Sequence, residues 1–547
     1  MSVHWPIIKR LLASPTRVVA TDDRRSYKGA EVLVAAMHVA SLIEKRSSTP
    51  TVATMFPSSG AFPICALAAW MLGRTVVPLN FLLSRDELKH VIGDCGTDII
   101  LTARPMIDFM GYTPEAKTIA FLEDIDFKSF PEPRWPKRAE DDEVAAFLYT
   151  SGTSGLPKGV KLTHANINAN INQVREGIDL DKNDCMFGVL PQFHSFGFTC
   201  LTLMPMSLGI RVVFAPRFVP HKIVAAFREH RPTVFVGIPS MYNALLSVKD
   251  AGPEDFKSFR ALISGGEPLP RAVADKFEER YGKPIFEGYG LTETSPVTHV
   301  NHPGAAKQGT VGKPLPGVRQ RIIDIESNAE QPPGRDGEIR LKGPNIFVGY
   351  HNMPEETDET FDDQGWFRTG DIGRVDAEGY LSITGRHKEM LIVGGENVFP
   401  REIEEVLNKH ESVKASGVIG VDDGSRGEGP VAFVELEEDA ELDASALRSF
   451  CRERLAGYKV PREIHAVDEL PRNPTGKIMR RKLKPKLDEI REKDSGKKDS
   501  GKKGSDQKDS GEKDSDQQKS EKKDSAKAKK KSAKKESAKT ESAKKDK

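Results

Sequence analysis

One twelve-residue stretch constrains the fold and the chemistry of this 547-residue chain more than any other. Residues 149–160 read YTSGTSGLPKGV and follow the apolar run AAFL. The segment 143–149 has the length and apolar character of a buried strand. Beyond the loop, Thr163 is a candidate helix cap, and apolar residues then recur at helical spacing at Ile167, Ile171 and Val174. A strand, a glycine loop and a helix in this order can direct backbone N–H groups at an anion.

The side chains of the loop suit a polyphosphate. Glycine permits close backbone approach, the hydroxyls are neutral donors, and Lys158 adds a point charge. The Walker A pattern is excluded, because Lys158 follows Pro157 and precedes Gly159. The later Gly476–Lys477 pair also lacks a glycine five positions before it. The loop alone is compatible with either a turn or a phosphate site.

Length and composition set the class of protein. A chain of 547 residues is too long for one core, so two or more domains are expected. The longest apolar run, 63–79, is broken by Arg74, and the N-terminus has no signal-peptide core. The five cysteines are scattered without a C-x-x-C pair, which fits reduced thiols better than disulfides or zinc. We therefore expect a cytoplasmic protein.

The C-terminal segment differs sharply in composition from the rest. From Lys493 to the end there are 20 lysines and 12 acids, with no Val, Ile, Leu, Met or aromatic residue. The segment thus carries +8 (20 − 12) of the net +1, leaving −7 elsewhere. It cannot bury apolar surface, so a disordered tail is expected. It is either a solvated appendage or an electrostatic contact to anionic membranes; no specific nucleic-acid contact is expected.

Four further motifs follow the loop in a fixed order. They are FEGYGLTETSP (286–296), WFRTGDIGR (366–374), TGRHKEMLIVGGENVFP (384–400) and PRNPTGKIMR (471–480). The series of five closely resembles the adenylate-forming (AMP-binding) superfamily, over about residues 15–487. Ser154 departs from the threonine common at its position but keeps the hydroxyl. The resemblance is strongest to bacterial long-chain fatty acyl-CoA synthetases and to the acyl-carrier-protein synthetase half of 2-acylglycerophosphoethanolamine acyltransferase proteins.

The resemblance implies an α/β fold with a mobile lid. Residues 1–385 are expected to form the large multi-sheet AMP-binding domain, and residues 386–490 a small α+β C-terminal lid domain. Residues 491–547 are the disordered Lys/Ser/Asp-rich tail. The implied reaction joins a carboxylate to ATP as an acyl-adenylate, releases pyrophosphate and then transfers the acyl group to a thiol.

An anion must then approach a polyanion, and each like-charge pair at about 4 Å costs about 4 kcal/mol at an effective dielectric of about 20. Fixed cations must offset this repulsion. By motif position the resemblance assigns Lys477 to the α-phosphate and Glu293 to Mg²⁺, with Thr150 as a second hydroxyl near the metal. The further nucleotide-binding residues that it implies are Ser151, Gly152, Thr153, Ser154, Gly155, Lys158, Gly288, Tyr289, Gly290, Thr292, Asp371 and Arg386.

Two of these residues have defined partners in the nucleotide. Tyr289 is expected to stack on adenine, and Asp371 to accept hydrogen bonds from the ribose hydroxyls with help from Arg386. The ordinary alternatives are a half-buried loop tyrosine and a turn aspartate.

The acyl group and the thiol require other residues. The resemblance puts His194 beside the carboxylate, and implies Phe198 as an aromatic gate and Gly265 and Gly266 as acyl-pocket wall. Ile238, Pro239 and Glu267 are expected to complete that wall. The hinge of the lid is assigned to Lys388, and Gly394 and Gly395 to the thiol tunnel.

The expected substrates are a fatty acid, ATP and coenzyme A. The leading hypothesis is a long-chain fatty acyl-CoA ligase, and the alternative is an acyl-carrier-protein ligase that serves lipid remodelling. A non-catalytic binding protein that uses its lysine-rich tail is disfavoured, because Lys477, Glu293 and Asp371 are all present. A luciferase-type oxidase finds no specific support in the sequence.

Overall fold

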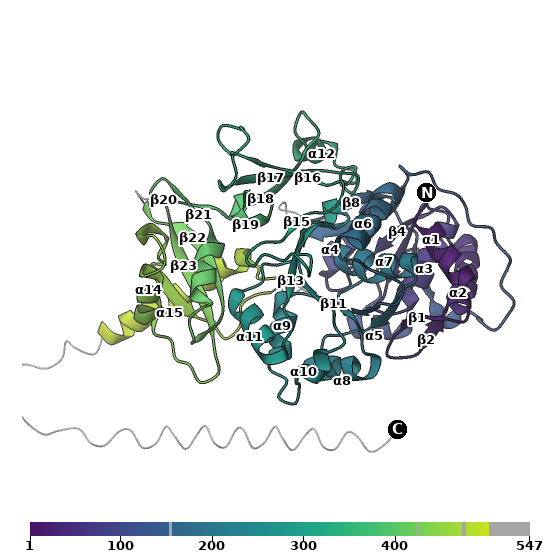
Figure 1. Ribbon diagram of the computed structural model, residues 1–547, viewed down its shortest axis with the longest axis horizontal. Coiled ribbons are helices and arrows are strands. Elements are labelled where there is room, and N and C mark those ends of the chain that lie inside the picture. Colours follow the sequence, from purple (N-terminus) through teal and green to yellow (C-terminus); the bar gives the residue numbers. More distant parts are fainter. Residues whose placement is uncertain (152–155, 425–426, 473–476, 503–547) are drawn as a thin grey trace, which may run out of the picture. The chain divides into compact units, whose positions relative to one another are not determined.

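The computed structural model describes residues 1–151, 156–424, 427–472 and 477–502. It has a mixed α/β fold with several sheets, a large N-terminal domain and a small C-terminal domain, as the resemblance predicted (Figure 1). The chain divides into two compact units, Met1–Lys484 and Pro485–Lys547, and each is described by itself. The boundary between 1–385 and 386–490 stays a prediction. The expected disordered tail lies mostly outside the described residues.

A nine-stranded sheet forms the centre of the large domain. Its order is β15-β14-β13-β12-β11-β9-β10-β1-β2, and the strands from β13 to β1 run parallel. Its strands are β1 (Val18–Thr21), β2 (Ser26–Lys28), β9 (Cys185–Gly188), β10 (Arg211–Phe214), β11 (Val234–Gly237), β12 (Ala261–Ser264), β13 (Phe286–Gly290), β14 (Val297–Val300) and β15 (Lys313–Pro314). Its inner parallel strands β9, β11 and β12 are buried along their whole length, as expected for a sheet covered on both faces.

A second sheet carries the glycine loop. Its order is β6-β5-β3-β4-β7-β8, and all neighbours are parallel except the last pair. Its strands are β3 (Thr51–Met55), β4 (Thr75–Pro78), β5 (Ile99–Thr102), β6 (Thr118–Phe121), β7 (Val144–Ser151) and β8 (Pro157–Thr163).

Three smaller sheets complete the fold. Strands β16 (Arg319–Ile323), β17 (Gly337–Lys342), β18 (Phe367–Val375) and β19 (Leu381–Arg386) form an antiparallel sheet. The small domain contains the hairpin of β20 (Leu391–Val393) and β21 (Glu396–Val398). It also contains a three-stranded sheet of β22 (Val413–Asp422), β23 (Glu428–Leu436) and β24 (Glu463–Ala466).

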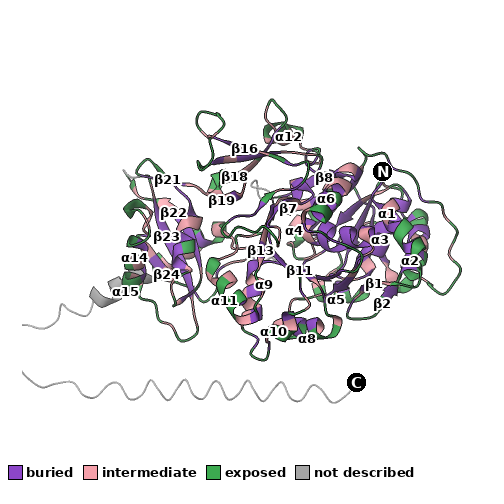
Figure 2. Ribbon diagram, viewed as in Figure 1, coloured by how far each residue is buried: buried purple, intermediate pink, exposed green. Residues whose placement is uncertain are grey.

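Helices cover these sheets, and buried residues concentrate on the strands and on the inward helix faces (Figure 2). In the large domain the helices are α1 (His4–Ala13), α2 (Gly29–Arg46), α3 (Ala61–Met71), α4 (Arg85–Asp94), α5 (Arg104–Met110), α6 (His164–Gly177), α7 (Met204–Leu208), α8 (Pro220–His230), α9 (Pro239–Leu246), α10 (Pro253–Phe256), α11 (Arg271–Tyr281) and α12 (Pro354–Thr360). The remaining ones are α13 (Pro400–Leu407), α14 (Ala444–Arg452) and α15 (Leu483–Lys502). A π-helix spans Phe196–Leu203, and short 3₁₀ turns span Leu122–Asp124, Thr292–Thr294, His387–Glu389, Gly457–Lys459 and Arg480–Lys482.

The predicted strand–loop–helix arrangement is wrong in one respect. The segment 144–151 is a strand and α6 begins after Thr163, whose hydroxyl accepts from the Asn166 N–H at 3.1 Å, as predicted. However, β8 intervenes and pairs antiparallel with β7, so the glycine loop is the turn of a hairpin. The short run PKGVKLT alternates between the two faces of the sheet and extends it before the helix starts. The loop is therefore not capped by a helix N-terminus.

The apolar run 63–79 covers strand β4 and, before it, most of helix α3. Ten of the eleven residues of α3 are buried, and Trp70 Nε1 donates to the carbonyl of Ala145 at 2.8 Å. Within the described part of the chain, no helix combines the length and hydropathy needed to cross a bilayer. All five cysteines are buried free thiols, as predicted.

Candidate active site

A cavity of about 280 Å³ brings several of the predicted residues together. Strand β13 contributes Gly288, Tyr289 and Gly290 to its wall. Strands β18 and β19 contribute Asp371 and Arg386, and the C-terminal segment contributes Lys477. Groups that the sequence separates by up to 189 positions (477 − 288) thus face one space.

Asp371 is the centre of a buried polar cluster in this cavity. Its side chain is 4% exposed and lies opposite Arg386 in the register of β18 and β19. Arg386 Nε donates to Asp371 Oδ1 at 2.8 Å, and the Tyr289 hydroxyl donates to Asp371 Oδ2 at 2.6 Å. Burial, reinforced by this carboxylate, raises the pKa of Tyr289 well above its ordinary value, and the carboxylate also raises the pKa of Arg386. Both oxygens of the Asp371 carboxylate are thus engaged and oriented, and carboxylate oxygens are suitable acceptors for a pair of hydroxyl groups.

A second cluster surrounds Glu293. The Tyr350 hydroxyl donates to Glu293 Oε1 at 2.9 Å, and burial raises the pKa of the Glu293 carboxyl. The Lys158 ammonium lies 5.6 Å from the centre of the Tyr350 ring and 3.9 Å from the Glu356 carboxylate. Thr292, next to Glu293, is buried with its hydroxyl 3.2 Å from that of Ser195. Tyr350 thus connects the two charges, because its hydroxyl bonds to the Glu293 carboxylate and its ring faces the Lys158 ammonium.

The donor set around Glu293 fits Mg²⁺. This ion is typically bound through one or two carboxylates together with substrate phosphates and water. In the described ranges no group of three or more His, Cys, Asp or Glu side chains could hold a metal by itself. Glu293, with Thr150 on β7 as a hydroxyl candidate, suits an ion that arrives with a phosphate.

Lys477 lies in a strongly electrostatic environment. Burial lowers the pKa of its ammonium, the Arg386 charge lowers it further, and Glu389 and Asp371 oppose the shift. The same ammonium contributes to neighbouring titrations. Burial first, and Lys477 second, lower the pKa of His194 to about 4, and the ammonium also offsets the burial of Glu267, whose pKa is raised. Lys477, His194 and Glu267 therefore lie within electrostatic reach of one another.

The glycine loop is only partly described. Thr150 and Ser151 end β7, where Thr150 pairs with Lys158 and Ser151 pairs with Pro157. The predicted phosphate-binding residues Gly152, Thr153, Ser154 and Gly155 lie outside the described residues.

The residues predicted to line the acyl pocket lie in different surroundings. Gly266 borders the cavity with a φ of +81°, a conformation that favours glycine. Phe198 is fully buried in the hydrophobic core, with Phe62 and Trp70 at 5.9 and 6.3 Å between ring centres. The aromatic ring beside Gly265 is instead Phe196, which a Cβ on that glycine would meet at 3.0 Å.

The structure does not bring the hinge and thiol-tunnel candidates to the cavity wall. Lys388 is exposed in the 3₁₀ turn His387–Glu389. Gly394 and Gly395 form the turn of the β20–β21 hairpin with φ of +61° and +87°, which side-chain-bearing residues adopt rarely. A Cβ on either glycine would meet nothing within 4 Å.

Sequence reasoning missed several residues of the site. Arg480 forms ion pairs with Glu389 at 2.6 Å and Glu404 at 2.7 Å, and these carboxylates raise the pKa of its guanidinium despite burial. Tyr350 was likewise given no role. Arg480 ends the motif PRNPTGKIMR and Tyr350 lies outside the five motifs, and nothing in the local pattern of either indicates its partner across the fold.

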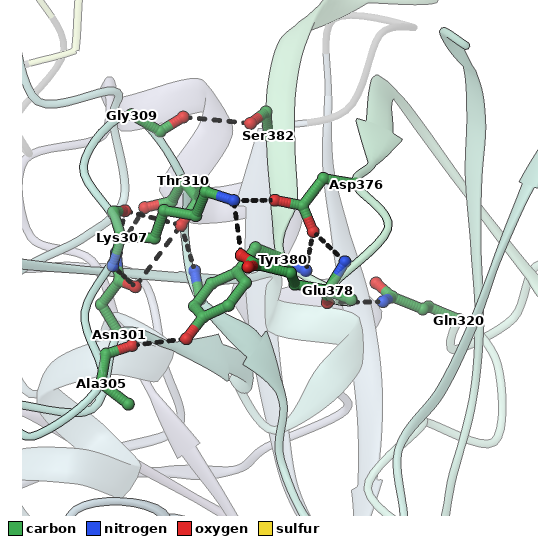
Figure 3. A network of polar contacts seen from close by, with 12 residues as sticks. Asn301, Ala305, Lys307, Gly309, Thr310, Gln320, Asp376, Glu378, Tyr380 and Ser382 are labelled. Atoms are coloured by element: carbon green, nitrogen blue, oxygen red, sulfur yellow. Dashed lines mark hydrogen bonds and ion pairs between the residues drawn. The ribbon is translucent and has the colours of Figure 1, made fainter. Parts of the chain in front are cut away.

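A polar network fixes the far end of the β18–β19 hairpin (Figure 3). The Lys307 ammonium lies 2.7 Å from both the Asp376 and the Glu378 carboxylates. The Tyr380 hydroxyl donates to the Ala305 carbonyl at 2.7 Å, and the Ser382 hydroxyl donates to the Gly309 carbonyl at 3.1 Å. This network, here called the Lys307 clamp, joins the β14–β15 connection to the hairpin that carries Asp371 and Arg386.

Comparison with known proteins gives a consistent picture. The sequence profile of the AMP-binding enzyme family matches residues 9–351, and that of the AMP-binding enzyme C-terminal domain matches residues 402–477. A long-chain-fatty-acid–CoA ligase of Bacillus subtilis (strain 168) is 35% identical over 79% of this chain and 84% of its own. A feruloyl-CoA synthase of Amycolatopsis sp. is 33% identical over 87% and 97%. The crystal structure of ATP-bound MatB from Rhodopseudomonas palustris superposes with a TM-score of 0.81 at 30% identity, covering 90% of this chain and 100% of that one.

Proposed function

The chain belongs to the AMP-binding enzyme family, and on that premise we propose that its acid substrate is a long-chain fatty acid. The general activity that the family and its relatives support, whatever the acid, is that of an adenylate-forming acid–CoA ligase. The choice of a long-chain fatty acid as substrate rests on the similarity to a long-chain-fatty-acid–CoA ligase over 79% of the chain. The feruloyl-CoA synthase defines the competing substrate class, an aromatic acid.

In the first half-reaction a carboxylate oxygen forms a bond to the α-phosphorus of ATP. The bond from that phosphorus to the bridging oxygen breaks, and pyrophosphate leaves. We propose that the Lys477 ammonium offsets the repulsion between the two anions, a barrier of about 4 kcal/mol for each close pair. Its electrostatic contact with His194, the candidate neighbour of the substrate carboxylate, supports this role.

The nucleotide is proposed to be held by the two polar clusters. Asp371 accepts hydrogen bonds from the ribose hydroxyls, and the ion pair with Arg386 orients its carboxylate. Tyr289 lies against adenine while its hydroxyl stays on Asp371. Glu293 and the Thr150 hydroxyl would hold Mg²⁺, which supplies positive charge to the phosphates when bound, and Lys158 would contact the outer phosphates.

In the second half-reaction a thiolate attacks the acyl carbon, the bond from that carbon to the AMP oxygen breaks, and AMP leaves. We propose that residues 386–490 rotate about Lys388 for this step and bring Gly394 and Gly395 to the thiol path. The exposure of Lys388 and the open space at both glycines are compatible with such a movement. We propose coenzyme A as the acceptor, and an acyl-carrier-protein thiol is the alternative.

A competition experiment tests the proposal. The full-length protein is incubated with ATP, Mg²⁺ and coenzyme A together with equal amounts of a long-chain fatty acid and ferulate, and both thioesters are quantified. We expect the fatty acyl thioester to dominate. Predominant feruloyl-CoA would overturn the long-chain assignment while leaving the ligase activity intact. Replacing coenzyme A by holo acyl carrier protein decides the acceptor.

A further inference from the structure

The two most exposed large apolar side chains among the described residues lie on one connection. Phe130 is 100% exposed and Trp135 is 83% exposed. Both belong to the segment between β6 and β7, which Figure 2 draws as largely exposed. Exposing one apolar side chain is ordinary, but two large aromatic rings within six residues cost hydrophobic free energy that a contact would recover.

Contacts near both ends hold this segment against the domain, so the exposed side chains between them are held in a defined place. At one end the Phe127 ring packs edge-on to His38 at 5.8 Å. At the other the Lys137 N–H donates to the Met71 carbonyl at 3.0 Å, and the Lys137 carbonyl lies 3.0 Å from His4 Nε2. Between these points Arg134, only 14% exposed, pairs with Glu44 at 2.9 Å. The prolines at 131, 133 and 136 restrict the backbone further.

The charges around the two rings are predominantly positive. The segment 127–138, FKSFPEPRWPKR, contains four cations and one acid. That acid, Glu132, is already engaged by Lys45 at 3.0 Å and by Arg134 at 3.7 Å. The cations Lys128, Lys137 and Arg138 are exposed. The acidic run 140–143 follows directly and limits the attraction, so the aromatic rings must supply most of the affinity.

Exposed aromatic rings flanked by cations match the chemistry of the membrane–water interface. Phe and Trp side chains partition to the boundary between headgroups and acyl chains, and neighbouring lysines and arginines attract anionic headgroups. We propose that the segment 127–138, here called the aromatic loop, docks the enzyme on an anionic phospholipid surface. The choice of a lipid surface rests on the proposed fatty-acid substrate, which partitions into bilayers, and the loop would hold the enzyme where that substrate is concentrated.

Vesicle co-sedimentation of the full-length protein tests the proposal. The vesicles contain equal parts of phosphatidylcholine and phosphatidylglycerol, at about 0.1 M and about 1 M salt, where electrostatic contacts are respectively present and largely screened. Any contribution of the lysine-rich tail would be electrostatic and screened at about 1 M salt, so binding that remains there reports on the aromatic loop. We expect the double variant Phe130→Ser, Trp135→Ser to bind at least about tenfold more weakly than wild type under these conditions. Its ligase activity on a dispersed short-chain acid should be unchanged.

Two controls make the result specific. Phe109→Ser removes another exposed phenylalanine, 51% exposed on α5, and should bind vesicles like wild type. Trp135→Phe keeps an aromatic ring and should retain binding, but should lose the blue shift of tryptophan emission that vesicles induce in wild type. Of the three other tryptophans, Trp70 and Trp366 are buried, and the half-buried Trp5 ring lies 5.9 Å from that of Trp135 between ring centres.

The proposal fails if wild type does not bind vesicles, if the double variant binds as well as wild type, or if Phe109→Ser loses as much. It also fails if the double variant instead dissociates an oligomer in size-exclusion chromatography without changing vesicle binding, because the loop would then contact a second copy. A wrong acid in the competition experiment leaves these binding measurements unaffected, so the two proposals can fail separately.

Discussion

The Tyr289–Asp371–Arg386 cluster and Lys477 border the same cavity, but the chain positions them in different ways. The cluster lies on β13, β18 and β19, and contacts of 2.6 and 2.8 Å orient its side chains toward one another. Lys477 comes from the C-terminal segment, and its contribution to the cavity is a charge whose pKa is lowered mainly by burial. Under the proposed function, the hydrogen-bonded cluster on these three strands binds the nucleotide, and Lys477 from the C-terminal segment supplies the catalytic charge.

Few described contacts join the two sides of the proposed hinge. Arg401 on α13 donates to the carbonyl of Ile383 on β19. The ring of Phe399 packs on Gly385, where a Cβ would come within 2.5 Å of it. Both contacts join a residue before Lys388 to one after it, so both would have to break in a rotation about that residue.

The largest effect is expected from removing the positive charge of Lys477. Lys477→Ala should slow acyl-adenylate formation by about 10²- to 10³-fold, because a positive group aimed at developing negative charge is lost. Carboxylate-dependent exchange of pyrophosphate into ATP measures this step. Transfer from supplied acyl-adenylate to coenzyme A should be retained. An unchanged rate of adenylate formation would contradict the assignment of Lys477.

The lowered pKa of Lys477 adds a pH signature to the same variant series. The protonated ammonium is the active form, so kcat/KM should be full below this pKa and should fall as pH rises through it, before the ordinary lysine value of 10.5 is reached. Lys477→Arg keeps its charge at such pH values. Its alkaline limb should therefore move upward even if its absolute rate is lower.

The next largest effect is expected at the proposed hinge residue, Lys388. Lys388→Pro fixes φ near the value of the present 3₁₀ turn and prevents a large change there. We expect pyrophosphate exchange within about threefold of wild type and a loss of thioester formation of about 10²-fold. Lys388→Ala is the matched control and should support both steps. Equal losses in both half-reactions of the proline variant would argue against a hinge.

A smaller effect is expected in the preorganised cluster. Asp371→Asn removes the negative charge that faces Arg386 and one of the two carboxylate oxygens that accept hydrogen bonds from Arg386 and Tyr289. It keeps the shape of the side chain. We expect kcat/KM for ATP to fall about 10- to 100-fold, or about 1.4–2.8 kcal/mol, with most of the change in KM. Asp336→Asn, on an exposed aspartate 3.3 Å from Arg374, is the control and should leave KM unchanged. A change confined to kcat would place Asp371 in the chemistry instead of in binding.

The sequence predicts features that depend on neighbouring residues better than features that depend on contacts across the fold. Local patterns correctly predicted a strand at 143–149, where β7 spans Val144–Ser151, and the Thr163 cap of α6. They failed where the outcome depends on pairing across the fold. Strand β8 forms by pairing with β7, which the local pattern of residues 157–163 does not indicate. Motif order identified Asp371 and Tyr289, but only the folded chain reveals that one bonds to the other.

The smallest effect is expected at the opposite end of the hairpin that carries Asp371. The Lys307 clamp resembles the Asp371–Arg386 pair in its distances, but Lys307 is 45% exposed and its carboxylate partners are 33% and 64% exposed. Exposed ion pairs contribute little, because water and salt screen them. The bonds from Tyr380 and Ser382 to the β14–β15 connection would also remain.

We therefore expect Lys307→Met to change kcat/KM for ATP by less than about threefold, and by still less as salt is raised. Lys313→Met, which removes a neighbouring cation 4.8 Å from the centre of the Tyr380 ring, is the matched control. If Lys307→Met instead weakened ATP use as strongly as Asp371→Asn, the clamp would be setting the position of the Asp371 carboxylate along the length of β18. The preorganisation now attributed to Tyr289 and Arg386 would then belong to the whole hairpin.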